Sequence, residues 1–143
     1  MEQTQVLRLQ ASDETMYTVL DAIEQQLDEY SCEESIKTEL LIAAEEIYIN
    51  IAHYAYGGET GEAIVQIQIE EETGICQIIF KDKGIPYNPL EKEDPNIHLS
   101  ATERGIGGLG IYMVKQTMDN VEYQYLDSYN ILKLEKTLKK KKD

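Results

Sequence analysis

The feature that most constrains this chain is a glycine-rich stretch, residues 104–110, which runs directly into a periodic apolar segment at 111–119. Its glycines carry no Cβ, so the backbone there can approach a ligand closely. The apolar period after them predicts that a helix begins at the end of the stretch. The free N–H groups and the positive dipole end of such a helix attract an anion, and a phosphate chain fits this role.

Arg104 would place a fixed positive charge beside that helix end, at a cost of about 0.3–1 kcal/mol that an intervening phosphate would remove. The spacing of Gly105, Gly107 and Gly110 also matches the dinucleotide-binding fingerprint, but a polar loop rather than a strand precedes it and too little chain follows. A P-loop is excluded because no Gly-Lys-Ser/Thr closes the stretch. One structural alternative stays open, in which the glycines only let a helix pack closely on a sheet.

Length and charge narrow the class of protein. A chain of 143 residues fits one domain, expected at 1–138, followed by a basic tail at 139–143 that we expect to be solvated. With 27 acidic against 13 basic residues, the net charge of -14 argues against direct nucleic-acid binding and against an anionic membrane as partner. No signal-peptide pattern and no long apolar run is found, so we expect a cytoplasmic protein. Cys32 and Cys76 suggest neither a zinc site nor a disulfide.

Hydrophobic periodicity predicts the order of the elements. Strands are expected at 6–9, 65–70, 75–80, 121–125 and 131–134. Helices are expected after an N-cap at Ser12, from a capping box of Ser31 and Glu34 to about Tyr56, and after the glycine-rich stretch. This order predicts a two-layer α+β domain, with helices on one face of a mixed, largely antiparallel sheet and the other face polar or used for assembly.

Asp82 follows a strand that is apolar on both sides and therefore buried, and it opens a turn punctuated by glycine and proline. A carboxylate in that place either accepts local N–H bonds or accepts from an exocyclic amine such as that of adenine. The segment from 84 to 103 that follows is a long polar loop without periodicity. Loops of that length are usually lids or binding loops.

Glu46, Asn50 and His53 are spaced so that all three project from one side of the second predicted helix, next to its apolar stripe. A carboxylate and an amide oxygen there could hold a hard cation such as Mg²⁺, which accepts few protein oxygens and keeps waters and phosphate oxygens for the rest. The alternative is an ordinary polar helix flank. His53 alone is expected to be a partly buried, hydrogen-bonded histidine.

These motifs occur in a fixed order that resembles the ATP-binding superfamily of DNA gyrase, histidine kinases and heat-shock chaperones. The closer resemblance is to the stand-alone bacterial anti-sigma factor serine kinases, and it covers nearly the whole chain. The segment from Glu46 to Asn50 with 54–56 looks like the first motif of that family, 82–86 like the second and 105–110 like the third. Two departures occur: Tyr54 stands where the family often has histidine, and the last strand lacks a threonine that many relatives aim at the nucleotide.

The resemblance implies a role for each matching position. Glu46 would be the catalytic base that takes the proton from a protein serine, and Asn50 would bind magnesium through its amide oxygen. Asp82 would accept from the adenine amino group, Gly84 would let the base approach, and Arg104 would lie near the γ-phosphate. The ATP-binding residues expected in this way are Asn50, Asp82, Gly84, Pro86, Arg104, Gly105, Gly107, Gly108 and Gly110.

The resulting hypothesis is an ATP- and magnesium-dependent serine kinase that phosphorylates an anti-anti-sigma-type antagonist and sequesters a sigma factor. The resemblance also suggests a homodimer formed through the sheet side or through the first strand and helix. One alternative is a non-catalytic binding module that uses ATP as a structural ligand. Another is a detached histidine-kinase-like ATPase domain, which the short 57–62 linker and the lack of an upstream helix with an acceptor histidine disfavour.

Overall fold

The computed structural model describes residues 2–91 and 109–142. Five strands form one sheet in the order β1-β2-β3-β5-β4, and all four pairings are antiparallel. The strands are β1 (Glu2–Gln10), β2 (Glu62–Glu70), β3 (Ile75–Asp82), β4 (Asn120–Leu126) and β5 (Tyr129–Thr137). The helices are α1 (Asp13–Glu29), α2 (Glu34–Asn50) and α4 (Leu109–Thr117), with a π-helical turn at Ile51–Ala55 and a 3-10 turn at Pro89–Glu91.

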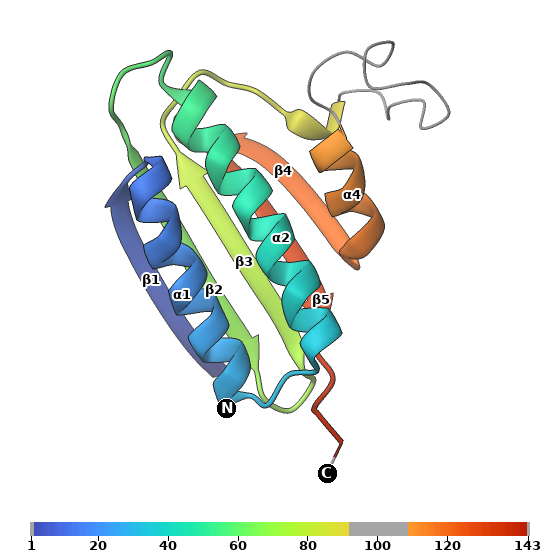
Figure 1. Ribbon diagram of the computed structural model, residues 1–143. Helices are drawn as coiled ribbons and strands as arrows, with labels where there is room; N and C mark the ends of the chain where they lie inside the picture. Colours follow the sequence, from blue (N-terminus) through green and yellow to red (C-terminus); the bar gives the residue numbers. More distant parts are fainter. Residues whose placement is uncertain (1, 92–108, 143) are drawn as a thin grey trace.

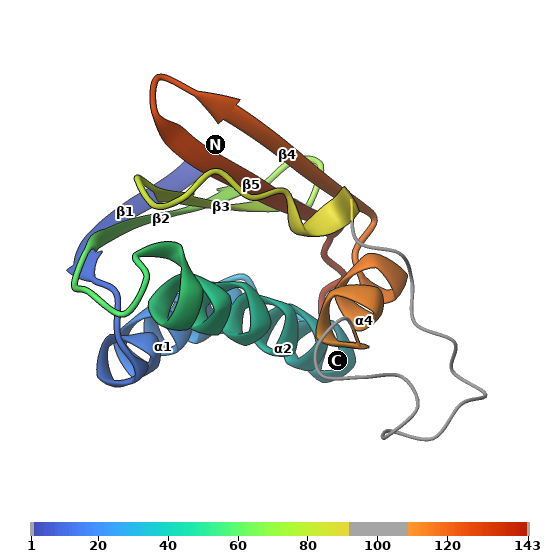
Figure 2. The ribbon, with the colours of Figure 1, turned by 90° about the horizontal axis from the view of Figure 1, so that it is seen from above.

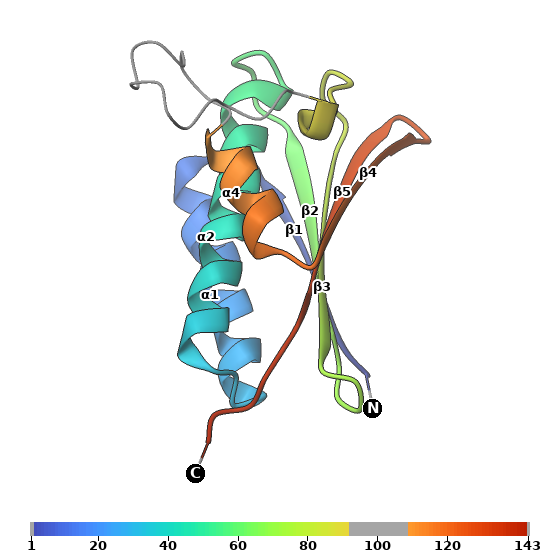
Figure 3. The same ribbon diagram turned by 90° about the vertical axis from the view of Figure 1, so that its right-hand side faces the viewer.

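The three helices cover one face of the sheet, as Figure 1 shows from the helix side. The two layers separate clearly when the molecule is viewed from above or from the side (Figures 2 and 3). The predicted two-layer α+β fold is therefore confirmed, with an antiparallel sheet throughout the described strands. No helix in the described part of the chain is long and apolar enough to span a membrane.

The core lies between the layers because the strands alternate. In β3 the side chains of Cys76, Ile78 and Phe80 are buried, whereas Gln77 and Ile79 between them are only half-buried. Each buried aliphatic or aromatic side chain contributes about 1.5–3 kcal/mol relative to an exposed one. The helices add the buried residues Met16, Val19, Ile23, Leu27, Leu40, Ala43, Ala44 and Ile47.

The starts of the first two helices differ from one another. At α1 the predicted cap is confirmed: Ser12 Oγ accepts from the Thr15 N–H and Thr15 Oγ1 accepts from the Ser12 N–H, each at 3.1 Å. The capping box predicted for α2 is wrong, because the helix begins at Glu34 without a side-chain cap. Ser31 instead has a left-handed φ of 64° and donates its N–H to the Asp28 carbonyl, so it closes the C-terminus of α1.

The C-terminal lysines lie against the turn between α1 and α2. The Lys139 carbonyl accepts from the Glu33 N–H, and the Lys141 N–H donates to the Ser31 carbonyl, both at 2.7 Å. The Lys141 ammonium also lies 2.8 Å from Glu34 Oε1. The backbone of this segment is thus attached to the fold, although its side chains are exposed.

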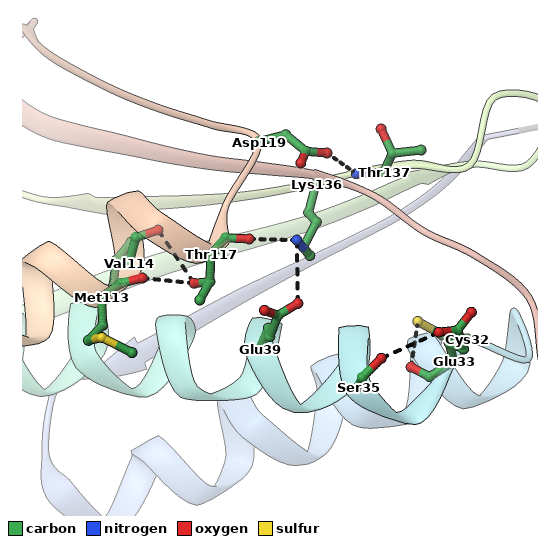
Figure 4. A network of polar contacts seen from close by, with 10 residues as sticks. All are labelled: Cys32, Glu33, Ser35, Glu39, Met113, Val114, Thr117, Asp119, Lys136 and Thr137. Atoms are coloured by element: carbon green, nitrogen blue, oxygen red, sulfur yellow. Dashed lines mark hydrogen bonds and ion pairs between the residues drawn. The ribbon is translucent and has the colours of Figure 1, made fainter.

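The C-terminal end of α4 is tied to the sheet and to α2, as Figure 4 shows. Lys136 Nζ on β5 donates to the Thr117 carbonyl at 2.5 Å and lies 3.5 Å from Glu39 Oε1. A cation is favourable there because the C-terminal end of a helix carries a partial negative charge. Asp119 makes two further hydrogen bonds with β5. Its N–H donates to the Glu135 carbonyl at 2.9 Å, and its Oδ2 accepts from the Thr137 N–H at 2.7 Å. This end of α4 is therefore held in place against β5.

Candidate functional site

A cavity of about 530 Å³ opens where the end of α2, the end of β3 and the loop after β3 meet. These ends and the start of α4 lie at the same end of the molecule (Figure 1). The volume is within the range of small-molecule sites, about 300–1,000 Å³. Four predicted site residues line it, namely Glu46 and Asn50 from α2, Asp82 from β3 and Pro86 from the loop. Segments far apart in the sequence therefore share one cavity.

Asp82 is the last residue of β3 and is buried. Its Oδ1 accepts from the Gly84 N–H at 2.9 Å and from Asn130 Nδ2 at 3.0 Å. Burial raises the pKa of the Asp82 carboxyl, while the hydrogen bonds from Asn130 and Gly84 act in the opposite direction. Within residues 2–91 and 109–142, Oδ2 accepts no hydrogen bond. One carboxylate oxygen is thus available to a molecule in the cavity.

Glu46 and Asn50 form a pair on the last turn of α2. Asn50 Nδ2 donates to Glu46 Oε1 at 3.3 Å, and both side chains are half-buried. Gly110, in the first turn of α4, lies directly against this carboxylate, because a Cβ there would collide with both Glu46 oxygens. Glu46 therefore faces the N-terminal turn of α4, whose partial positive charge favours an anion. Because Gly110 has no side chain, α4 can approach the Glu46 carboxylate this closely.

His53 is not part of this group. Its Nε2 lies 2.6 Å from Asp13 Oδ1 at the start of α1, and its side chain is 45% exposed. It is hydrogen-bonded, as predicted, but it is exposed rather than partly buried. The prediction that it shares a side with Glu46 and Asn50 is wrong. The physical reason is the π-helical turn Ile51–Ala55, because a wider turn changes the direction in which each later side chain points.

The remaining predicted glycines fall in different places. Gly84 does not line the cavity, and a Cβ there would collide with the backbone of Ala55. The neighbouring Ile85 N–H donates to the Ala55 carbonyl at 2.8 Å, so the glycine allows the loop after β3 to pack on the end of the helix. The predicted residues Arg104, Gly105, Gly107 and Gly108 lie outside the described residues.

Asn130 is the polar cavity residue that the sequence analysis did not predict. It is buried at the start of β5, directly opposite Asp82 on β3. Its Nδ2 also donates to the Ile85 carbonyl at 3.1 Å, and its Oδ1 accepts from the Tyr87 N–H at 3.1 Å and from the Tyr123 hydroxyl. One signal was present, because Asn130 continues the inward-facing alternation of the last strand toward the turn.

Most of the cavity wall is apolar. Tyr54 and Tyr87 also contribute to the lining, and 68% of Tyr54 and 58% of Tyr87 is exposed to solvent. Such a wall with a few polar groups suits a flat heterocycle better than an ion. The apolar lining residues are Ile47, Ile51, Ala55, Phe80, Ile85, Pro86, Pro89, Ile111 and Leu132.

The donor set at the α2 end fits a magnesium ion only together with other oxygens. No group of three or more His, Cys, Asp or Glu side chains in the described ranges could hold a metal ion alone. Asn50 offers an amide oxygen and Glu46 a carboxylate, both in the same cavity. Mg²⁺ is commonly bound in this way, by one or two protein oxygens with phosphate oxygens and waters.

Comparison with known proteins identifies the family of this chain. The model of the histidine kinase-like ATPase domain matches residues 9–136. The chain belongs to this family. Among curated proteins, the serine-protein kinase RsbW of Bacillus pumilus (strain SAFR-032) is 34% identical over 93 residues, which covers 60% of this chain and 56% of that protein. The resemblance inferred from the three motifs is thereby confirmed.

A solved structure has a similar fold. The RsbU and RsbW domains of Rv1364c from Mycobacterium tuberculosis match 95% of this chain and 32% of that chain, with a TM-score of 0.66 and 15% identity. At that identity the likeness concerns the fold alone. The chain spans 56% of the length of the curated relative, so the activity of that whole protein does not pass to this chain by similarity.

Proposed function

We propose that this chain binds ATP with Mg²⁺ and transfers the γ-phosphoryl group to a serine hydroxyl of a protein. The observation that carries the proposal is that Glu46, Asn50 and Asp82, from two elements far apart in sequence, line one cavity of about 530 Å³. Membership of a histidine kinase-like ATPase family supports ATP as the nucleotide.

Asp82 marks the base end of the proposed site. A buried carboxylate with one free oxygen is a good acceptor for the exocyclic amino group of adenine. The side chains of Phe80 and Leu132 line the cavity beside it and offer apolar surface to the faces of the ring. Recognition at this end therefore combines one polar contact with burial of the base.

Asn50 and Gly110 mark the phosphate end. The amide oxygen of Asn50 would hold the magnesium ion, which neutralises phosphate charge when bound. Residues 104–108 immediately precede α4, and their predicted role in wrapping the phosphates, with Arg104 near the γ-phosphate, belongs to this proposal.

Glu46 is the proposed general base. Asn50 occupies its Oε1, which leaves Oε2 to take the proton of the serine hydroxyl. In that step the serine Oγ bonds to the γ-phosphorus, the bond from phosphorus to the bridging oxygen breaks, and ADP leaves. Such a transfer depends mostly on alignment and charge neutralisation, so loss of Glu46 should lower turnover far more than ATP affinity.

The proposed partners follow from the resemblance to anti-sigma factor serine kinases. They are an anti-anti-sigma-type protein as phosphoryl acceptor, a sigma factor as sequestered partner, and a second copy of the chain. The sheet face that carries no helices supports the homodimer, because Val6, Gln66 and Ile79 lie in register across its first three strands and 53% of Val6 is exposed (Figure 3). Sedimentation equilibrium would measure the oligomeric state.

The experiment that tests the function separates binding from transfer. Titration calorimetry with ATP, with and without Mg²⁺, would be run on the wild type, Glu46→Gln and Asp82→Asn. We expect Asp82→Asn to lose affinity and Glu46→Gln to retain it. Labelled ATP with a candidate acceptor should then give transfer that Glu46→Gln abolishes.

Two outcomes would contradict parts of the proposal. Absence of ATP binding would contradict the whole proposal. Normal Mg²⁺-dependent binding without transfer to any acceptor would favour the alternative of a non-catalytic, ATP-dependent protein-binding module.

A further inference from the structure

The Asn130 side chain can adopt only one orientation in its surroundings. Its Nδ2 faces three acceptors, namely Asp82 Oδ1 at 3.0 Å, the Ile85 carbonyl at 3.1 Å and the Gly84 carbonyl at 3.4 Å. Its Oδ1 faces the N–H of Tyr87 at 3.1 Å. A flipped amide would place the oxygen against three acceptors, so the network fixes which atom faces Asp82.

This orientation divides the Asp82 carboxylate into two different oxygens. Oδ1 accepts from both Asn130 and Gly84. Oδ2 accepts no hydrogen bond from the part of the chain that the structure describes, and Asp82 lines the cavity. Burial raises the pKa of the Asp82 carboxyl, and both donors oppose that shift because they bond to the charged form, which can only accept hydrogen bonds.

An acceptor-only carboxylate discriminates between purines. The 6-amino group of adenine donates a hydrogen bond to it, whereas the 6-oxo group of hypoxanthine or guanine would place a second acceptor against the same oxygen. A protonated or rotated Asp82 would lose this discrimination, since a carboxylic acid can also donate. The selectivity of the site therefore depends on whatever holds Asp82 charged and in place.

We infer that Asn130 is a positioning residue that determines base specificity: by donating to Asp82 Oδ1 it makes the cavity select 6-aminopurine over 6-oxopurine nucleotides. The inference rests on the proposed function, since it presumes that a purine nucleotide occupies the cavity. It goes beyond that function because it assigns the selectivity to a residue that contacts Asp82 rather than to Asp82 alone.

The test compares the affinities of ATP and ITP, which differ in the 6-substituent of the base and in the hydrogen on the adjacent N1. Calorimetry on the wild type should show ATP bound at least about tenfold more tightly, as expected for one hydrogen bond to a charged group. Asn130→Asp keeps the shape and the acceptor for Tyr87 but replaces the donors with a second carboxyl against Asp82 Oδ1. This favours the protonated form of Asp82, whose acid group can donate to the 6-oxo group. In this variant we expect ATP to bind more weakly, ITP to bind more tightly, and the ratio to fall by about tenfold or more.

Tyr123→Phe is the control for selectivity: Tyr123 lines the same cavity, and the change removes one hydroxyl from Asn130 Oδ1 but leaves the Nδ2 contact with Asp82 in place. It should lower stability without changing the ATP-to-ITP ratio. A merely structural role for Asn130 would change both affinities equally in Asn130→Asp.

The outcomes separate the inference from the function on which it rests. An unchanged ratio in a folded Asn130→Asp variant would overturn the inference and leave ATP binding intact. A wild type that binds neither nucleotide would overturn the proposed function, and the inference with it. If the variant does not fold, the side-chain amide resonances of Asn130 in the wild type decide: they should shift with ATP and not with an equal occupancy of ITP, and equal shifts would refute the inference.

Discussion

Gly110 is the position where one methyl group would test how closely α4 approaches α2. A Cβ there would collide with both oxygens of Glu46, which are the far end of a flexible side chain. Alanine is also the better helix former, by about 0.5–1 kcal/mol. Gly110→Ala therefore combines a gain in helix stability with displacement of the Glu46 carboxylate.

The two contributions can be separated by a double-mutant cycle. Displacing Glu46 removes the hydrogen bond from Asn50 and costs about 0.5–1.5 kcal/mol. Gly110→Ala alone should then change the free energy of unfolding by less than about 0.5 kcal/mol. In a Glu46→Ala background nothing is displaced, so the same change should stabilise by about 0.5–1 kcal/mol. The expected coupling energy between the two positions is about 1 kcal/mol.

Urea unfolding of the wild type, the two single variants and the double variant measures this coupling. The corresponding shift in Tm is about 3 °C for a domain of this size. Glu45→Ala is the matched control, because Glu45 precedes Glu46 on α2 but lines the outer groove between α1 and α2, where Gly110→Ala should act additively. Equal effects of Gly110→Ala with and without Glu46, within about 0.3 kcal/mol, would refute the contact and the geometry proposed for the phosphate end.

Three further substitutions give separate tests of the fold and the site. Gly84→Ala should destabilise by about 1–3 kcal/mol in urea unfolding, because its Cβ would meet the backbone of Ala55 rather than a flexible side chain. Lys136→Met should cost about 1–3 kcal/mol in thermal unfolding, because the Thr117 carbonyl at the end of α4 would lose its donor. Asp82→Asn should stabilise the protein at neutral pH. Since burial raises the pKa of Asp82, the folded state holds that proton more tightly than the unfolded chain does, and wild-type stability falls as pH rises through the folded pKa. The gap in urea midpoint between Asp82→Asn and the wild type should therefore close as the pH is lowered toward about 4.

The elements could be predicted because their periodicity is local. The strict alternation in β2 and the apolar stripes of α1 and α2 identify type and approximate extent, although β1 reaches from Glu2 to Gln10 where only 6–9 was predicted. Edge strands carry fewer apolar residues, so their ends leave a weaker pattern. The Ser31 error has a different cause, since the same residue types close one helix and start another.

Asn130 was missed because of the turn before it. Asn130 was expected in the loop between the last two strands, whereas the turn consists only of Asp127 and Ser128, which both have positive φ. Residues other than glycine rarely adopt a positive φ, so the residue types at these two positions do not reveal so short a turn. The pairing of Asn130 with Asp82 depends on this register. The π-helical turn that redirects His53 is equally invisible in the apolar period.

The two ends of the cavity are held in place in different ways, so substitutions at each end should affect different properties of the protein. Asp82 and Asn130 lie on adjacent strands in fixed register, so the base end is set by the sheet itself. Glu46 is a flexible side chain on α2, and its position depends on Gly110 at the start of α4. The described polar contacts of α4 with the sheet, such as that of Lys136, are at the opposite end of this helix. Changes to the base end should therefore appear first in nucleotide affinity and selectivity. Changes around α4 should appear first in turnover, because the start of α4 sets the distance between Glu46, the proposed general base, and the acceptor hydroxyl.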